Sequence, residues 1–160
     1  WPGFIALDGN LTEGLLSEIA TSPLFAAADL RVAPASPGKA KRLLPLIAHP
    51  TATLYVNLEE ANILARSEHP TAAEAATALL SRGAGRVLVT NGGKPAAEGR
   101  QGQGVIEGQP PHVLVTRVTG AGDTFMAAHL VAERRGASRQ EALDEALRAA
   151  ATYVSGEIGA

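Results

Sequence analysis

The sequence contains no cysteine, which excludes disulfide bridges, thiolate metal sites and cysteine nucleophiles. Aromatic residues make up only 4% of the chain, and no apolar run approaches the roughly 20 residues that a membrane-spanning helix needs. Positive and negative charges nearly balance, since the net charge is -2 at pH 7, and the sequence has neither a basic stripe nor an acidic tail. We therefore expect no nucleic-acid partner and no membrane partner.

The beginning of the chain shows no charged segment followed by an apolar one, so no signal peptide is visible. The lack of cysteine suits the reducing cytoplasm, where we expect the protein to reside. The chain is 46% hydrophobic and 19% charged, a balance typical of a globular domain. Because a core-like apolar run starts at Phe4 and the last helical pattern ends without a tail, we expect residues 1–160 to be a single partial domain cut from a longer chain.

Short apolar runs alternate with helical patterns along the chain, which predicts an α/β fold with a mostly parallel sheet covered by helices. A glycine-dotted stretch at 98–107 predicts a small antiparallel excursion. The expected strands are 3–8, 29–33, 53–56, 86–90 and 113–117, and the expected helices are 10–20, 37–48, 58–66, 71–82, 120–135 and 138–155.

Several expected helices begin with a polar residue followed three positions later by glutamate, the pattern of a capping box. These pairs are Asn10–Glu13, Thr71–Glu74 and Ser138–Glu141. Ser36 precedes Pro37, which suits a cap followed by proline at the first helical position. Pro45 lies inside that helix and predicts a kink.

The stretch 113–125 carries the clearest chemical signal, because an expected strand runs into Gly120-Ala121-Gly122 and a helix starts inside that turn. Small residues let a ligand approach the backbone. The first amides of a helix have no partner within it, and the helix dipole adds positive potential there. Such a turn suits the phosphates of a nucleotide. Asp123 follows in the first helical turn, where a carboxylate could take a proton from an attacking hydroxyl.

The same residues also fit a plain structural interpretation, a glycine turn with Asp123 as a first-turn helix stabiliser, and residue types alone leave both open. Two better-known phosphate motifs are excluded. No Gly-Lys-Ser/Thr follows, so the turn is not a P-loop, and the glycine spacing is not that of a dinucleotide-binding dehydrogenase.

Two further strand ends carry candidate ligand residues, since residues just past the carboxyl ends of parallel strands face the ligand crevice. Asn57 and Glu60 offer oxygen atoms suited to magnesium, which is held through few protein groups and keeps its waters; a helix cap by the same pair is the alternative. Thr90 and Gly92 follow the next strand and also fit an ordinary turn. Lys39 is either a solvated side chain or a residue near the active site. His49, His69, His112 and His129 have no metal-ligand spacing.

Residues 118–125, Val-Thr-Gly-Ala-Gly-Asp-Thr-Phe, resemble the second signature of PfkB-family carbohydrate kinases, Asp-Thr-x-Gly-Ala-Gly-Asp-x-Phe. Residues 54–61 resemble the family's strand followed by Asn-x-x-Glu, and 87–94 its strand ending in Val-Thr-x-Gly. Residues 7–10 and 34–40 also have counterparts in the same order. The resemblance covers nearly the whole chain and implies a ribokinase-like three-layer sandwich that lacks the amino-terminal lid.

The resemblance implies ATP-dependent phosphorylation of a hydroxymethyl group on a sugar or nucleoside, with ATP and Mg²⁺ as cofactors. Asp123 would be the catalytic base. The remaining implied site residues are Gly120, Ala121 and Gly122 as the anion hole, Thr90, Gly92 and Thr119 along the nucleotide, Asn57 and Glu60 at the magnesium through water, and Lys39 near the active site. Within the family, the Asp-Gly-Asn start, the Ser-x-x-Lys segment and Val-Thr-Gly-Ala-Gly-Asp together look most like pseudouridine kinases.

One position departs from the family pattern, because Arg117 stands where many ribokinase-like enzymes have the aspartate of a monovalent-cation site. A fixed positive charge repels potassium, so we expect no potassium activation. Intact Gly120–Asp123 argues against the rival hypothesis of a non-catalytic nucleotide-binding or regulatory module.

The family is about twice as long, and its amino-terminal half carries most of the sugar-binding residues. The 160 residues alone are therefore expected to bind nucleotide weakly and turn over poorly, because positioning supplies much of phosphoryl-transfer catalysis. We also expect this chain to form a homo-dimer or otherwise self-associate through sheet edge left uncovered by the missing half.

Overall fold

The structure is a computed structural model, and it describes residues 3–156. Its centre is a six-stranded sheet in the order β1-β2-β3-β4-β5-β6. The first four strands run parallel, and the last two pair antiparallel to their neighbours. The strands are β1 (Phe4–Asp8), β2 (Asp29–Ala33), β3 (Ala52–Asn57), β4 (Arg86–Asn91), β5 (Lys94–Arg100) and β6 (Gly104–Gly108). This confirms the mostly parallel α/β sheet, and the excursion expected at 98–107 is the β5–β6 hairpin.

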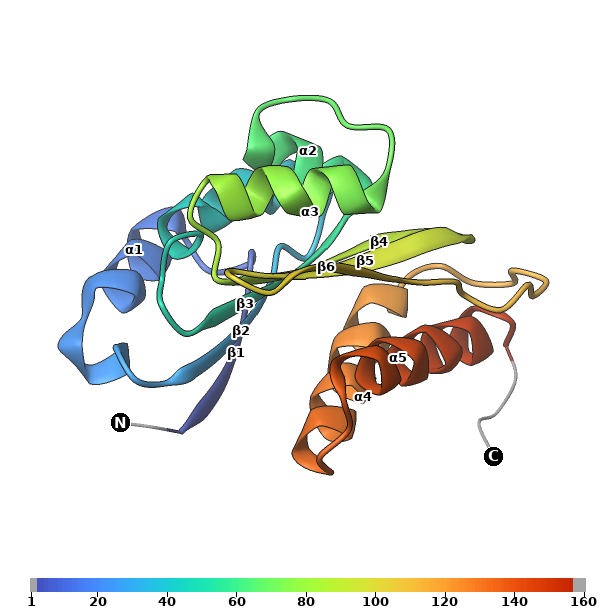
Figure 1. The fold of residues 1–160 in the computed structure, drawn as a ribbon. Helices are drawn as coiled ribbons and strands as arrows, with labels where there is room; N and C mark the ends of the chain where they lie inside the picture. The colour runs from blue at the N-terminus through green and yellow to red at the C-terminus, as the bar shows by residue number, and fades with distance from the viewer. Residues whose placement is uncertain (1–2, 157–160) are drawn as a thin grey trace.

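Helices cover both faces of the sheet and make three layers (Figure 1). Alternate strand residues face the two layers, so each face has its own apolar core. The first layer holds α1 (Glu13–Thr21), the 3₁₀ segments η1 (Pro23–Phe25) and η2 (Pro37–Leu46), α2 (Leu58–Ala65) and α3 (Ala72–Ser81). The second holds α4 (Ala121–Arg134) and α5 (Arg139–Val154). No helix in residues 3–156 is long and apolar enough to cross a membrane.

Two expected helices differ from the structure, the first in its cap residue and the second in its type and its end. The cap of α1 is Thr12, whose hydroxyl accepts from the Leu15 amide at 3.1 Å, because the Asn10 side chain is bonded to Asp8 instead. The helix expected at 37–48 is the shorter 3₁₀ segment η2, and Ser36 makes no side-chain cap bond there. Pro45 lacks the amide that an α-helix needs at this position, which favours the tighter geometry.

The strand expected at 113–117 is wrong, because these residues form no strand in the structure. Their backbone is instead attached to the end of α5, where the Val154 carbonyl accepts from the amides of Thr116 and Arg117. Leu114 is 82% exposed and Val118 is 70% exposed. The apolar, β-rich composition of this stretch predicted a strand, but no neighbouring strand lies beside it among the described residues.

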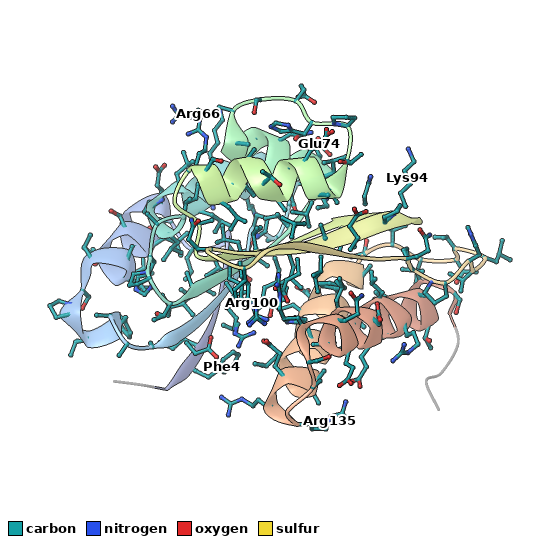
Figure 2. The ribbon with its side chains drawn as sticks, in the orientation of Figure 1. Phe4, Arg66, Glu74, Lys94, Arg100 and Arg135 are labelled. Carbon is teal, nitrogen blue, oxygen red and sulfur yellow. The ribbon has the colours of Figure 1, made fainter. Side chains whose placement is uncertain are left out.

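The carboxyl end of α4 is fixed to the sheet by a group of charged residues that we call the ion cluster. Its members are Arg31, Arg86, Arg100, Arg139, Asp29, Glu98 and Glu133. Glu133 of α4 accepts from Arg31 Nη1 at 2.6 Å and from Arg86 Nη1 at 2.9 Å. Figure 2 shows Arg100 on the side of the sheet that faces α4 and α5.

The first turn of α5 joins the same cluster through Glu98, whose side chain is fully buried. Its Oε1 atom accepts from Arg100 Nε at 2.9 Å and from Arg139 Nε at 2.8 Å. His129 is buried and lies one helical turn before Glu133. Its Nδ1 atom is 2.8 Å from the Tyr55 hydroxyl oxygen. Phe125 stacks on His129, so the inner face of α4 is packed along its length.

Candidate functional site

The carboxyl ends of β1 and β2 and the amino end of α4 enclose a hollow of about 330 Å³. Asp8 and Ala33 are register partners at those two strand ends. Asp123, in the first turn of α4, faces the same hollow as Asp8. The lining residues are Ala6, Leu7, Asp8, Leu11, Ala33, Asp123 and Met126. Two carboxylates therefore share one open depression at the edge of the sheet where ligands bind in α/β folds.

The turn that leads into α4 has the conformation that its glycines predict. Gly120 is the N-cap residue, with φ of 94°, in the left-handed region that favours glycine. The Gly120 carbonyl accepts from the Thr124 amide at 3.0 Å and from the Thr124 hydroxyl at 2.9 Å. This bond starts the helix directly after the turn.

The backbone amides at the start of α4 differ in whether they have a hydrogen-bond partner, which bears on the anion hole expected from Gly120, Ala121 and Gly122. The Ala121 amide donates to the Val118 carbonyl at 3.0 Å and is used by the turn itself. The amides of Gly122 and Asp123 make no hydrogen bond within residues 3–156. The unpartnered amides at this turn are therefore those of Gly122 and Asp123, while Gly120 has the left-handed backbone conformation of the N-cap.

The Asp123 side chain is exposed and makes no hydrogen bond or ion pair with any residue that the structure describes. Acidic residues in a first helical turn are stabilising through the helix dipole, so this position alone still fits the structural interpretation. The shared hollow with Asp8 adds an observation that a mere helix stabiliser does not require.

Asp8 is the site residue to which the sequence reasoning gave no role. Its Oδ1 atom accepts from the Asn10 amide at 2.8 Å, and its Oδ2 atom accepts from the Asn10 side chain at 3.2 Å. Asn10 in turn accepts from Lys39 Nζ. A side chain at Gly9 would meet the Pro34 carbonyl oxygen at 2.1 Å, so only glycine fits this turn. The strand-end rule, applied to β1, would have found Asp8.

Lys39 is thus placed beside the hollow by a chain of contacts through Asn10 to Asp8. The loop is further held by Arg42, whose Nη1 atom donates to the Gly9 carbonyl at 2.8 Å. These contacts are compatible with both alternatives for Lys39, a solvated side chain and a residue near the active site.

Asn57 and Glu60 form the capping box that was the structural alternative for this pair. Asn57 Oδ1 accepts from the Glu60 amide at 2.8 Å, and Glu60 Oε1 accepts from the Asn57 amide at 2.9 Å. Burial raises the pKa of the Glu60 carboxyl, and the bond from the Asn57 amide partly opposes this. Glu60 Oε2 takes no part in the box. Within residues 3–156, no group of three or more histidine, aspartate or glutamate side chains is arranged to hold a metal.

The three remaining residues predicted from the sequence lie at three places: near the end of β4, in the β4–β5 turn and just before α4. Thr90 is the register partner of Asn57, so both residues lie at the carboxyl ends of neighbouring strands, where ligands bind in α/β folds. Gly92, with φ of 57°, lies in the exposed turn between β4 and β5, as the turn alternative proposed. Thr119 precedes the α4 turn, and its carbonyl accepts from the Tyr153 hydroxyl at 2.6 Å. Thr119 is therefore adjacent to the turn that starts α4, whereas Gly92 lies in the turn that follows β4.

A family model described as "pfkB family carbohydrate kinase" matches residues 6–157. A comparison with curated protein sequences found no match. Among solved structures, the chain is similar to an Arabidopsis thaliana ribokinase complexed with ribose and ATP, with 27% identity and a TM-score of 0.78. It is also similar to a carbohydrate kinase from Agrobacterium tumefaciens, with 27% identity and a TM-score of 0.76.

An adenosine kinase from Sinorhizobium meliloti has the same fold, with 21% identity and a TM-score of 0.78. The match covers 98% of this chain with the ribokinase, 92% with the carbohydrate kinase and 98% with the adenosine kinase. It covers 51%, 46% and 50% of those proteins, respectively. The chain therefore spans about half the length of these solved relatives.

Proposed function

The chain belongs to the PfkB family of carbohydrate kinases, and from this premise we propose that it carries the phosphoryl-transfer half of an ATP-dependent kinase. The acceptor is a hydroxymethyl group of a sugar or nucleoside. The observation that supports this best is the unpartnered carboxylate of Asp123, which faces the hollow beside the open amides at the start of α4.

The proposed reaction uses Asp123 as the general base. The acceptor hydroxyl gives its proton to the carboxylate while its oxygen attacks the γ-phosphorus of ATP, and the bond to the ADP oxygen breaks. Negative charge spreads over the oxygens of the transferred phosphoryl group. The amides of Gly122 and Asp123 donate to those oxygens, and the helix dipole adds positive potential at the same point.

Asp8 and Lys39 complete the acceptor side of the proposed site. Asp8 lines the hollow with Asp123 and is an acceptor for a second hydroxyl of the same substrate. Both Asp8 oxygens are held by Asn10, so the carboxylate is already oriented before substrate binds. Such orientation lowers the entropic cost of positioning the acceptor. Lys39 adds positive charge near the transferred phosphoryl group.

The nucleotide side of the site is proposed at Thr90, Gly92 and Thr119. Magnesium would be held near the phosphates through water by Glu60 and Asn57, where it neutralises phosphate charge. The donor set fits this use, because Glu60 Oε2 lies outside the capping box while the box fixes the side chain.

The proposal is tested by assaying the full-length protein with ATP, Mg²⁺ and four acceptors, namely pseudouridine, ribose, fructose and adenosine. Pseudouridine is our first candidate, and a result that ranks it poorest would overturn that assignment. ATP binding without transfer to any acceptor would favour a non-catalytic nucleotide-binding module.

The variant Asp123→Asn tests the role of the base directly. We expect kcat to fall by roughly 10²–10⁴-fold, because the amide cannot take the proton. ATP affinity should stay nearly unchanged, since Asp123 acts on the acceptor hydroxyl. Near-normal turnover by this variant would remove Asp123 from the mechanism.

Self-association of the 160-residue chain remains part of the proposal. β1 is at the edge of the sheet and pairs only with β2 among residues 3–156. An uncovered edge presents free amides and carbonyls to another chain. We propose that this edge is covered either by further sequence of the complete kinase or by a second copy.

A further inference from the structure

The segment that leads into the α4 turn is attached to the carboxyl end of α5 rather than to the sheet. The Val154 carbonyl accepts from the Thr116 amide at 2.7 Å and from the Arg117 amide at 3.1 Å. The Thr116 hydroxyl adds a third bond to the same carbonyl at 3.2 Å. This carbonyl lies in the last turn of α5, where helix carbonyls lack partners within the helix.

Two side chains strengthen this attachment. The Arg117 guanidinium lies 4.1 Å from the centre of the Tyr153 ring, and its Nε atom donates to the Tyr153 carbonyl at 2.7 Å. A cation on an aromatic face and at a helix carboxyl end is favoured on both counts. The Tyr153 hydroxyl donates to the Thr119 carbonyl at 2.6 Å. We call this arrangement of Arg117 and Tyr153 the Arg117–Tyr153 clamp.

The Arg117–Tyr153 clamp also reaches the first residue of the turn. A Cβ atom at Gly120 would lie 2.4 Å from the Tyr153 hydroxyl oxygen, so Tyr153 occupies the space beside this glycine. Gly120 is the N-cap of α4. The position of Tyr153 therefore limits where Gly120 can lie. Because Gly120 is the N-cap of α4, it also limits where the amides of Gly122 and Asp123 can lie.

We propose that Tyr153 and Arg117 are positioning residues, which hold the Gly120 turn so that the Gly122 and Asp123 amides and the Asp123 carboxylate meet the phosphoryl group. This inference rests on the proposed kinase function of the same turn. Arg117 is exposed and Tyr153 is half-buried, and neither belongs to the two apolar cores. Loss of the Arg117–Tyr153 clamp should therefore affect turnover more than stability.

The chain offers a matched control, because its two tyrosines are in different environments. Tyr55 is buried, and its hydroxyl accepts from Arg31 and contacts His129 instead of the residues of the turn. Arg135 is a matched control for Arg117, since it pairs with Glu145 on the surface. The four variants Tyr153→Phe, Tyr55→Phe, Arg117→Met and Arg135→Met are made in the full-length protein.

We expect Tyr153→Phe and Arg117→Met to lower kcat about tenfold with little change in the KM of the acceptor, because misplacement affects the transition state most. Their thermal unfolding midpoints should match the wild type. Tyr55→Phe should lower the midpoint and keep kcat, and Arg135→Met should change neither. A wild-type kcat in Tyr153→Phe, or an equal loss of kcat in both tyrosine variants, overturns the proposal.

Hydrogen–deuterium exchange of the free full-length protein separates this inference from the kinase function itself. Peptides that cover 116–123 should exchange faster in Tyr153→Phe than in the wild type and in Tyr55→Phe. Unchanged exchange there would refute the clamp. An enzyme that transfers no phosphate from ATP, yet shows the faster exchange, would refute the function and leave the clamp intact.

Discussion

Asp123, near the amino end of α4, and Glu133, near its carboxyl end, are ten residues or about 15 Å apart along the helix. Their environments differ in burial and in charge pairing. At the carboxyl end, Glu133 is bonded to Arg31 and Arg86, and His129 is fully buried. At the amino end, Asp123 is exposed and has no partner among the described residues. One helix thus begins in an open site and ends in the ion cluster.

This difference separates charged residues that stabilise the fold through ion pairs from a charged residue that does not. A buried charge must be paired, because an unpaired one carries a desolvation cost of several kcal/mol. Glu98 and Glu133 meet this condition through their arginine partners. Although burial by itself raises the pKa of the Glu133 carboxyl, hydrogen bonds from Arg86 and Arg31 lower it to about 2. Asp123 makes no comparable contact among the described residues, and we have proposed for it a role toward a ligand rather than toward the fold.

Breaking the carboxyl end should have the largest effect on stability. Glu133→Gln leaves Arg31 and Arg86 without their shared counter-charge, so we expect a loss of about 3–5 kcal/mol in the free energy of unfolding. Chemical denaturation measures this. The control is Glu145→Gln, which removes a surface partner of Arg135 and should cost less than about 1 kcal/mol. Equal losses in the two variants would mean that the ion cluster does not hold α4.

Low pH should destabilise the protein through the groups at the carboxyl end of α4, namely His129 and Glu133. Burial lowers the pKa of the His129 imidazole from 6.5 to about 4, with Arg86 and Arg31 adding to this and Glu133 opposing it. The unfolded chain therefore binds the proton first, and stability falls as the pH drops from 6.5 toward 4. Glu133, whose pKa is lowered from 4.5 to about 2, adds a further loss below pH 4.5.

We expect His129 to account for about 3 kcal/mol of this loss. Urea unfolding at several pH values between 7.5 and 4.5 measures the slope. In His129→Gln the decrease between pH 6.5 and 4.5 should be smaller than in the wild type. A slope that is the same in His129→Gln and the wild type would assign the acid sensitivity to other groups.

The smallest expected change in stability is at the open end. Gly122 has no heavy atom within 4 Å of an added Cβ, and it is not among the glycines with positive φ. Gly122→Ala should therefore stabilise the fold by up to about 1 kcal/mol, since alanine favours helix. The added methyl group lies beside the open amides, so kcat/KM for ATP should fall. An increase in stability with unchanged kcat/KM would show that no phosphate approaches this backbone.

Local sequence patterns predicted much of the fold because they report on nearest neighbours. The bounds expected for β2 match, and the Ser138–Glu141 capping box is present. The same locality explains the errors. Residues 113–117 have strand-like composition, but a strand also needs a partner strand, which composition does not report. At Asn57 and Glu60, spacing could not separate cap from metal site, and the structure shows the cap.

The alternation of strands and helices, the glycine turn before α4 and the candidate base Asp123 could be predicted from the sequence, because each depends on residues close in the chain. Which distant groups come into contact depends on how the chain folds. The tertiary structure placed Asp8 on the same hollow as Asp123, brought Tyr153 against Gly120, and gathered the ion cluster around Glu133. These contacts join residues more than thirty positions apart in most cases, and only the packing of helices on the sheet fixes such pairs in space.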